Sequence, residues 1–219
     1  IQTFDGKVLH DFSFTLLEAI RFHSWRGNDH TCMFYDNDAY ASSGIPVGSV
    51  EFVSESLRLQ GYPVPKPRNV PTELFPFAGR NIFNGKERDA PDGASFAKSN
   101  DKIKDIIYQT LMVYELDKPL PTGNYQFSSI VDFISEWRAF VWRGKLVGLQ
   151  NYSGEFTVFP DVDRIHQMIK AFKGPCAYTL DVGIIDGVTC VVEVHDFFSC
   201  GLYGFADLQL LPLMVGGWY

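Results

Sequence analysis

Two carboxylates and an imidazole are expected close together on a hairpin late in the sequence. Asp181 lies in Tyr-Thr-Leu-Asp-Val-Gly, and Glu193 and His195 lie in Val-Val-Glu-Val-His. Because side chains alternate along a strand, Glu193 and His195 share one face. Carboxylate oxygens are ligands that Mg²⁺ prefers, and two close carboxylates repel unless a cation lies between them. The pattern indicates a divalent-metal site; the alternative is a solvated hairpin face with ordinary surface acids.

The face taken by Asp181 depends on the turn between the two strands. A two-residue turn at Asp186-Gly187 puts Asp181 on the face opposite to Glu193. A three-residue turn over 185–187 brings both carboxylates onto one face. Metal binding requires the second arrangement, so we expect an extra residue or bulge in this turn. Without a bound cation, we also expect a raised pKa for at least one of the two carboxylates.

Two basic residues in strand-like runs could bind anionic groups. Arg138 follows Glu136 on the same face of the predicted strand Ser-Glu-Trp-Arg-Ala-Phe-Val. Its guanidinium could bind a phosphate or carboxylate through two hydrogen bonds, or it could form a structural ion pair. Lys98, in Phe-Ala-Lys-Ser, ends an apolar strand, where an ammonium group suits the phosphates of a nucleotide. The nearby Lys102 and Lys104 are interpreted as part of a solvated loop.

Other chemistries receive less support from the sequence. Neither Gly-x-x-x-x-Gly-Lys-Ser/Thr nor Gly-x-Gly-x-x-Gly occurs, so a bound nucleotide would need another phosphate cradle. Cys200 and His195 could form a thiol–imidazole pair, but no third orienting motif accompanies them, and a buried structural cysteine is favoured. The 4 cysteines contain no Cys-x-x-Cys pair, which favours reduced thiols over a disulfide framework.

The composition restricts the partners of the protein. The 219 residues carry a formal net charge of −7, which disfavours nucleic acid as a main partner because phosphate binding needs Lys and Arg. The longest apolar stretches are too short to span a bilayer, so no membrane association is expected. No secretory signal is apparent, and together with the reduced thiols this favours the cytoplasm.

The elements that must position these side chains change in character along the chain. Residues 1–76 alternate apolar and amphipathic stretches and end in a Pro-rich connector over 62–76, so we expect a small β/α lobe. Residues 77–219 contain several β-rich runs and a helical stretch over 161–172, so we expect a mainly antiparallel lobe with helices. The predicted fold class is α+β.

Taken in order, these motifs resemble the ATP-grasp superfamily, most closely its phage and bacterial branch related to the ribosomal-protein glutamate ligases. The resemblance covers about 47–205 and is carried mainly by Ser135-Glu-Trp-Arg-Ala-Phe-Val, Tyr178-Thr-Leu-Asp-Val-Gly and Val192-Glu-Val-His with Gly201-Leu-Tyr-Gly. Weaker support comes from Val47-Gly-Ser-Val-Glu-Phe-Val and Phe96-Ala-Lys. The resemblance implies an N-terminal pre-ATP-grasp lobe over 1–76. It also implies a catalytic region over 77–219, made of two subdomains around a nucleotide cleft, with a hinge near 127–133.

The resemblance also implies roles for individual residues. Lys98 and Arg138 would be the catalytic residues that contact the phosphates of ATP. The implied ATP-binding set is Lys98, Ser128, Ser129, Ile130, Val131, Asp132, Glu136 and Arg138. Asp181 and Glu193 match the magnesium ligands of the family. His195 stands where the family usually has Asn, and because imidazole favours softer metals than Mg²⁺, Mn²⁺ is an alternative ion.

The activity implied by the resemblance is that of an ATP-dependent carboxylate–amine ligase. Such an enzyme phosphorylates a carboxylate to an acyl phosphate, from which an amine displaces phosphate to form an amide or peptide bond. The substrates would be a small-molecule or peptide carboxylate and an amine; the sequence specifies neither them nor the oligomeric state. The alternatives are a nucleotide-binding module with weak catalysis, suggested by His195, and a protein-interaction module whose acidic and aromatic residues serve packing.

Overall fold

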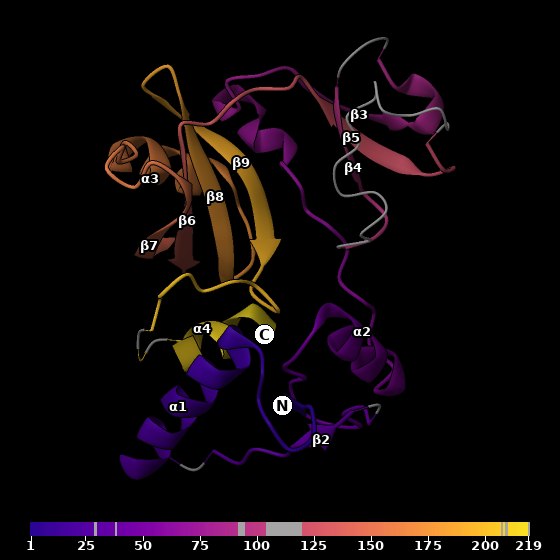
Figure 1. Cartoon of the computed structure of the whole chain (residues 1–219), viewed down its shortest axis with the longest axis vertical. Helices are drawn as coiled ribbons and strands as arrows, with labels where there is room; N and C mark the ends of the chain where they lie inside the picture. Colours follow the sequence, from indigo (N-terminus) through magenta and orange to yellow (C-terminus); the bar gives the residue numbers. More distant parts are fainter. Residues whose placement is uncertain are drawn as a thin grey trace. The chain divides into compact units, whose positions relative to one another are not determined.

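The structure of the chain is a computed structural model (Figure 1). It describes residues 1–28, 30–37, 39–91, 95–103, 120–206, 208 and 210–218, so Lys104 lies outside the described residues. The chain divides into two compact units. Unit 1 comprises Ile1–Pro65, Pro175–Tyr178 and Asp196–Tyr219, and unit 2 comprises Lys66–Gly174 and Thr179–His195. The division into 1–76 and 77–219 expected from the sequence stays a prediction.

Unit 1 combines helices with a short parallel pair of strands. The pair is formed by β1 (Gln2–Thr3) and β2 (Tyr35–Asp36), and the helices are α1 (Asp11–Trp25), α2 (Val50–Leu59) and α4 (Leu210–Trp218). Helix α1 packs against α4. Helix α2 begins at Val50 because the Ser49 hydroxyl accepts a hydrogen bond from the Phe52 amide, which caps an otherwise unsatisfied donor. None of the helices in the described ranges is long and apolar enough to cross a membrane.

The first sheet of unit 2 has three antiparallel strands in the order β3-β5-β4. Its strands are β3 (Ile82–Lys86), β4 (Phe96–Ser99) and β5 (Asn124–Ser128), and the short helices η1 (Thr72–Phe77) and η2 (Glu87–Asp89) flank β3 in the sequence. The buried residues Ala97, Leu120, Tyr125 and Phe127 form the core beneath this sheet. Strand β4 carries Lys98, and it pairs with β5 so that Lys98 lies opposite Gln126.

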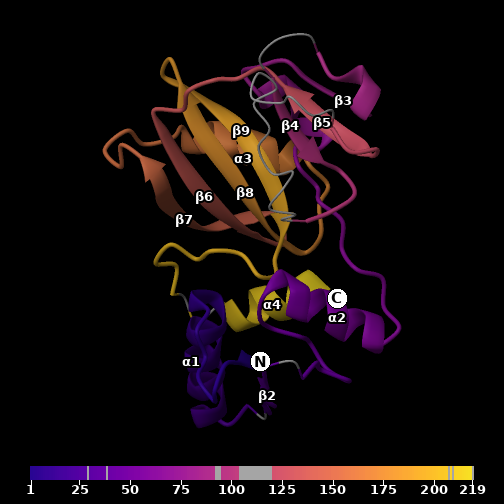
Figure 2. The same ribbon diagram turned by 45° about the vertical axis from the view of Figure 1, so that its right-hand side comes forward.

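The second sheet of unit 2 has four strands in the order β7-β6-β8-β9. Its strands are β6 (Ser135–Trp142), β7 (Lys145–Gly154), β8 (Ala177–Ile185) and β9 (Val188–Asp196). Helix α3 (Val162–Ala171) begins where the Asp161 carboxylate caps two amides, and it lies across one face of the sheet (Figure 2). The buried side of α3 consists of Ile165, Met168 and Ile169. This arrangement confirms the predicted α+β class with a mainly antiparallel second region.

The hairpins of this sheet both close with two-residue turns. Arg143 and Gly144 have φ values of 49° and 70°, and Asp186 and Gly187 have values of 50° and 78°. Two successive left-handed residues form a type I′ turn, whose twist matches that of the flanking strands. The prediction of an extra residue in the turn over 185–187 is therefore wrong, because β8 ends at Ile185 and β9 begins at Val188.

The end of β7 requires a glycine, and this requirement can be measured. Gly154 has a φ of +70°, and a Cβ atom there would lie 2.3 Å from the carbonyl oxygen of Ile134. Gly144 has the same φ of +70° with nothing within 4 Å of such a Cβ. We expect Gly144→Ala to lower the free energy of unfolding by about 1–2 kcal/mol, the cost of the left-handed backbone. Gly154→Ala should cost at least about 1 kcal/mol more, because the clash is with the backbone.

Urea denaturation of the two variants measures this difference. The same loss of unfolding free energy in both would show that the contact between Gly154 and Ile134 carries no packing constraint.

Candidate functional site

Five charged or titratable side chains of unit 2 converge from four strands, and we call them the charged cluster. They are Lys98 on β4, Arg138 on β6, Asp181 on β8, and Glu193 and His195 on β9. Ligand atoms of Asp181, Glu193 and His195 all lie within 4.8 Å of one another. The structure thus brings together the three residues that the sequence indicated as metal ligands, with the two proposed phosphate-binding residues beside them.

Arg138 and Asp181 form a buried bidentate ion pair at the base of the charged cluster. Arg138 Nε donates to Asp181 Oδ1 at 2.8 Å, and Nη2 donates to Oδ2 at 2.7 Å. The side chains are only 7% and 1% exposed. The parallel geometry is the strongest that a guanidinium offers to a carboxylate, and it neutralises a charge that could not otherwise be buried. In this structure, Arg138 therefore binds a carboxylate of the cluster.

Glu193 is held between two positively charged or ionisable partners. Lys98 donates to Glu193 Oε2, and the His195 ring nitrogen Nε2 contacts Oε1 of the same carboxylate. Burial raises the pKa of Glu193, but the charges and hydrogen bonds of His195 and Lys98 outweigh burial and hold the pKa well below its usual value. The expectation of a raised pKa is wrong for Glu193, because the protein supplies the neutralising cations itself.

Tyr152 belongs to the same region, although the sequence gave no signal for it. Its hydroxyl donates to Glu136 Oε2 at 2.7 Å, and its ring centroid lies 5.8 Å from the Arg138 guanidinium carbon. Burial, together with the charges of Asp181 and Glu136, raises the pKa of Tyr152, so the hydroxyl stays protonated and donates. The register shifts from Glu136–Ser153 to Trp137–Asn151, which leaves Tyr152 unpaired, and simple alternation along the sequence could not reveal this shift.

The proximity of Asp181 and Glu193 comes from an irregular strand rather than from the turn. A regular ladder starting at a two-residue turn would put the two carboxylates on opposite faces. However, the successive carbonyls of Val191 and Val192 both accept hydrogen bonds from Arg80, at 2.7 and 3.1 Å. Successive carbonyls of a regular strand point in opposite directions, so β9 is irregular here. The expected irregularity exists, but it lies within the strand.

The segment predicted to be a hinge connects the two sheets of unit 2. Ser128 ends β5, and Ser129 exchanges two hydrogen bonds with the Asn81 backbone, each of 3.1 Å. Residues 130–132 lead from there toward β6. Among the described residues, Ser128, Ser129 and 130–132 form no side-chain hydrogen bond or ion pair with the charged cluster. Their predicted contact with a nucleotide stays a prediction.

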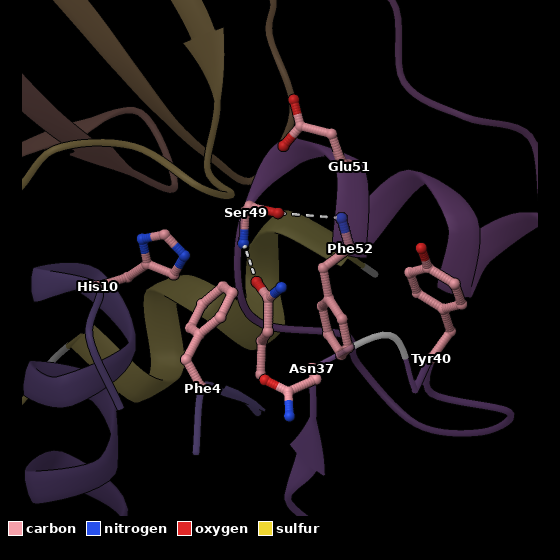
Figure 3. Close-up of a pocket in the computed structure, with 8 residues that line it drawn as sticks. Phe4, His10, Asn37, Tyr40, Ser49, Glu51 and Phe52 are labelled. Atoms are coloured by element: carbon pink, nitrogen blue, oxygen red, sulfur yellow. Dashed lines mark hydrogen bonds between the residues drawn. The ribbon is translucent and has the colours of Figure 1, made fainter. Parts of the chain in front are cut away.

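Unit 1 contains a separate pocket that includes none of the predicted site residues. Its volume is about 620 Å³, and the Phe4 and Phe52 rings and the His10 imidazole point toward one another around it (Figure 3). The Ser49 amide donates to the Gln2 side chain at 2.8 Å, which fixes the start of α2 at the pocket wall. The lining residues are Gln2, Phe4, His10, Asn37, Tyr40, Ser49, Glu51 and Phe52.

The donor atoms of the charged cluster fit a divalent cation with oxygen preference. Asp181 and Glu193 supply carboxylate oxygens, and His195 supplies a nitrogen, all within 4.8 Å of one another. Two hard oxygen donors suit Mg²⁺ and Mn²⁺, whereas the imidazole shifts the preference toward Mn²⁺. The adjacent Lys98 and Arg138 could bind the phosphates that normally accompany such an ion.

The buried pair of Arg138 and Asp181 predicts a large effect on stability. We expect Arg138→Met to lower the free energy of unfolding by about 3–5 kcal/mol, because the Asp181 carboxylate stays buried without its partner. Replacing both residues, as Arg138→Met with Asp181→Leu, should recover most of this loss. Arg21→Met is the control, since it removes an exposed pair with Glu18 whose side chains are 66% and 50% exposed.

Chemical denaturation of the four proteins gives the values. A small loss for Arg138→Met, similar to that for Arg21→Met, would contradict the view that the buried pair stabilises unit 2.

Comparison with known proteins places this geometry in a family. A family model for an ATP-grasp domain, the second family of its clade, matches residues 77–213. The structure resembles a RimK domain protein ATP-grasp from Sphaerobacter thermophilus DSM 20745 with 14% identity and a TM-score of 0.53, covering 99% of this chain and 96% of that chain. It also resembles D-alanine–D-alanine ligase from Bacillus anthracis, with 10% identity, a TM-score of 0.47 and coverage of 99% and 96%. No curated protein matches the sequence. Since the family model spans more than half of the sequence, this chain belongs to that family of ATP-grasp domains, which confirms the predicted superfamily and fold.

Proposed function

We propose that this chain is an ATP-dependent carboxylate–amine ligase that forms an amide or peptide bond through an acyl phosphate. Its family membership supports the use of ATP. The observation that carries the proposal is the convergence of Asp181, Glu193 and His195, with ligand atoms within 4.8 Å, next to the cations Lys98 and Arg138. A metal-ligand set adjacent to two phosphate-binding cations is what phosphoryl transfer requires.

The residues of the charged cluster change partners when substrate binds in this proposal. Asp181, Glu193 and His195 hold the divalent ion, and this frees Lys98 and Arg138 from their carboxylate partners. A bound Mg²⁺ or Mn²⁺ supplies charge neutralisation at the phosphates. Lys98 then contributes a single ammonium and Arg138 a bidentate fork to the phosphate oxygens. Tyr152 keeps its hydrogen bond to Glu136 and its ring against Arg138, so the guanidinium stays oriented during the exchange.

The reaction proceeds in two displacements. A carboxylate oxygen of the first substrate attacks the γ-phosphorus of ATP, and ADP leaves. The amine nitrogen of the second substrate then attacks the carbonyl carbon, phosphate leaves, and the nitrogen gives up a proton. Lys98 and Arg138 stabilise the negative charge that develops on the transferred group. No side-chain nucleophile is required, because positioning and charge neutralisation carry the catalysis.

The proposed substrates are a small-molecule or peptide carboxylate and an amine, and the proposed location is the cytoplasm. Cys32, Cys176, Cys190 and Cys200 are all free thiols. We further propose that the segment over 127–133 meets the adenine edge of ATP and that 77–219 forms the catalytic region. Phosphate release, measured with ATP, Mg²⁺ or Mn²⁺ and each amino acid in turn as carboxylate or amine donor, tests the activity directly.

A second candidate is a nucleotide-binding module with little turnover. It is favoured by one observation, namely that the carboxylates of the charged cluster already have cationic partners in Lys98, Arg138 and His195. If these pairs persist with ATP bound, the metal ligands stay occupied and phosphoryl transfer is slow. Tight ATP binding without phosphate release for any amine or carboxylate would support this candidate over the ligase.

Lys98 provides the first test of the nucleotide site. We expect ATP with Mg²⁺ to raise the melting temperature of the wild type, because a ligand that binds only the folded state stabilises it. Lys98→Ala should strongly reduce this shift, since the ammonium at the end of β4 no longer meets the phosphates. Lys86→Ala is a matched control, because Lys86 ends β3 of the same sheet and is exposed.

Thermal melts at several ATP concentrations measure the shift. Equal shifts in the wild type and in Lys98→Ala would remove Lys98 from the phosphate site.

His195 provides the second test, through metal preference. Asn offers a hard oxygen where His offers a nitrogen, so His195→Asn should keep or improve phosphate release with Mg²⁺. The ratio of the Mn²⁺-supported rate to the Mg²⁺-supported rate should fall by at least about threefold, less than about 1 kcal/mol of barrier. His166→Asn is the control, because His166 lies on α3 outside the charged cluster.

Initial rates of phosphate release with each ion give the ratio. An unchanged ratio in His195→Asn would show that the imidazole is not a ligand of the ion.

A further inference from the structure

Arg80 binds three backbone carbonyls at once, two of them in β9. Its Nη1 donates to Val191 O at 2.7 Å and to Ala78 O at 3.2 Å, and its Nη2 donates to Val192 O at 3.1 Å. The guanidinium thus spans two successive carbonyls that both point to the free edge of β9. Glu193, a proposed ligand of the ion, is the next residue along the strand.

The backbone around Arg80 is shaped to allow this contact. Gly79 has a φ of +63°, and a Cβ atom on it would lie 2.3 Å from the Cys190 sulfur, so only glycine brings the chain this close to β9. On the other side, the Phe133 ring centroid lies 5.6 Å from the Arg80 guanidinium carbon. Phe133 in turn packs over Gly183 of β8, where a Cβ atom would lie 2.2 Å from the ring. The guanidinium is therefore fixed in place from both sides.

We propose that Arg80 is a positioning residue, whose two hydrogen bonds to Val191 and Val192 hold β9 in the irregular conformation that puts Glu193 on the face of Asp181. The turn at Asp186-Gly187 has two residues, and a regular strand following it would turn Glu193 to the opposite face. The irregularity exposes two carbonyls on one edge, and only a group with two parallel donors satisfies both together. The value of this placement for metal binding rests on the proposed function.

Lysine cannot replace Arg80 in this role. An ammonium group keeps the positive charge near Glu193 but lacks the planar fork that reaches two neighbouring carbonyls. Arg80→Lys therefore separates the geometric role from an electrostatic one, since only the geometric role is lost. Arg80→Gln, whose amide keeps donors without the charge, is the second variant if Arg80→Lys does not fold.

Arg164 offers a matched control on the same strand. Its Nε donates to the Thr189 carbonyl at 2.6 Å, and its guanidinium carbon lies 5.5 Å from the Phe77 ring centroid. Like Arg80, it is a half-buried arginine bound to a β9 carbonyl and stacked on a phenylalanine. It contacts one carbonyl near the turn, however, and lies outside the irregular part of the strand.

The experiment combines two measurements on the full chain. The first is amide hydrogen exchange of residues 190–195 without metal, and the second is titration with Mn²⁺ in the presence of ATP. For Arg80→Lys we expect exchange in this segment to be at least about tenfold faster and the Kd for Mn²⁺ at least about tenfold higher. For Arg164→Lys we expect both quantities to stay within about twofold of the wild type, even if the melting temperature falls.

Three results would overturn the proposal. They are an Arg80→Lys protein with wild-type exchange over 190–195, equal effects of the Arg80 and Arg164 substitutions, and weaker ATP binding in EDTA for Arg80→Lys, which would make Arg80 a phosphate ligand. If the wild type binds no Mn²⁺ with ATP, the proposed function fails instead. In that case the hydrogen exchange alone decides whether Arg80 holds β9.

Discussion

The buried pair of Arg138 and Asp181 is the interaction on which the rest of the candidate site depends. A carboxylate that is 1% exposed can stay ionised only if a cation is bound to it, and the bidentate guanidinium meets this requirement. The pair joins β6 to β8 at the centre of the sheet, and Tyr152 on β7 packs against the same guanidinium. The orientation of three strands is therefore coupled to one ionised acid.

The second carboxylate is held more loosely, and this difference suits an exchange of partners. Glu193 is 17% exposed and its partners Lys98 and His195 are 27% and 31% exposed, so water can replace them at lower cost. A cation that enters the charged cluster would first compete for Glu193 and only then for Asp181. The cluster thus has an accessible side and a buried side, and the buried side maintains the geometry while the accessible side changes partners.

Much of this site could be predicted from the sequence because the relevant patterns are local. The alternation in Val-Val-Glu-Val-His, the apolar strand before Lys98 and the cap of α3 at Asp161 each depend on neighbouring residues only. The fold class followed from the same periodicities, and the resemblance to ATP-grasp proteins added the order of the motifs. What failed was the location of the irregularity that brings Asp181 beside Glu193, and the pKa of Glu193.

Both failures concern contacts between residues that are far apart in the sequence. The irregularity of β9 depends on Arg80, more than a hundred residues earlier, and no property of β9 itself shows where its register changes. The pKa of Glu193 likewise depends on Lys98, which neutralises a charge that hairpin reasoning left unpaired. Tyr152 was missed for the same reason, because a register shift between β6 and β7 turns it toward Glu136. In this protein, the strand irregularities position the site, and each is fixed by side chains or strands that local periodicity does not connect.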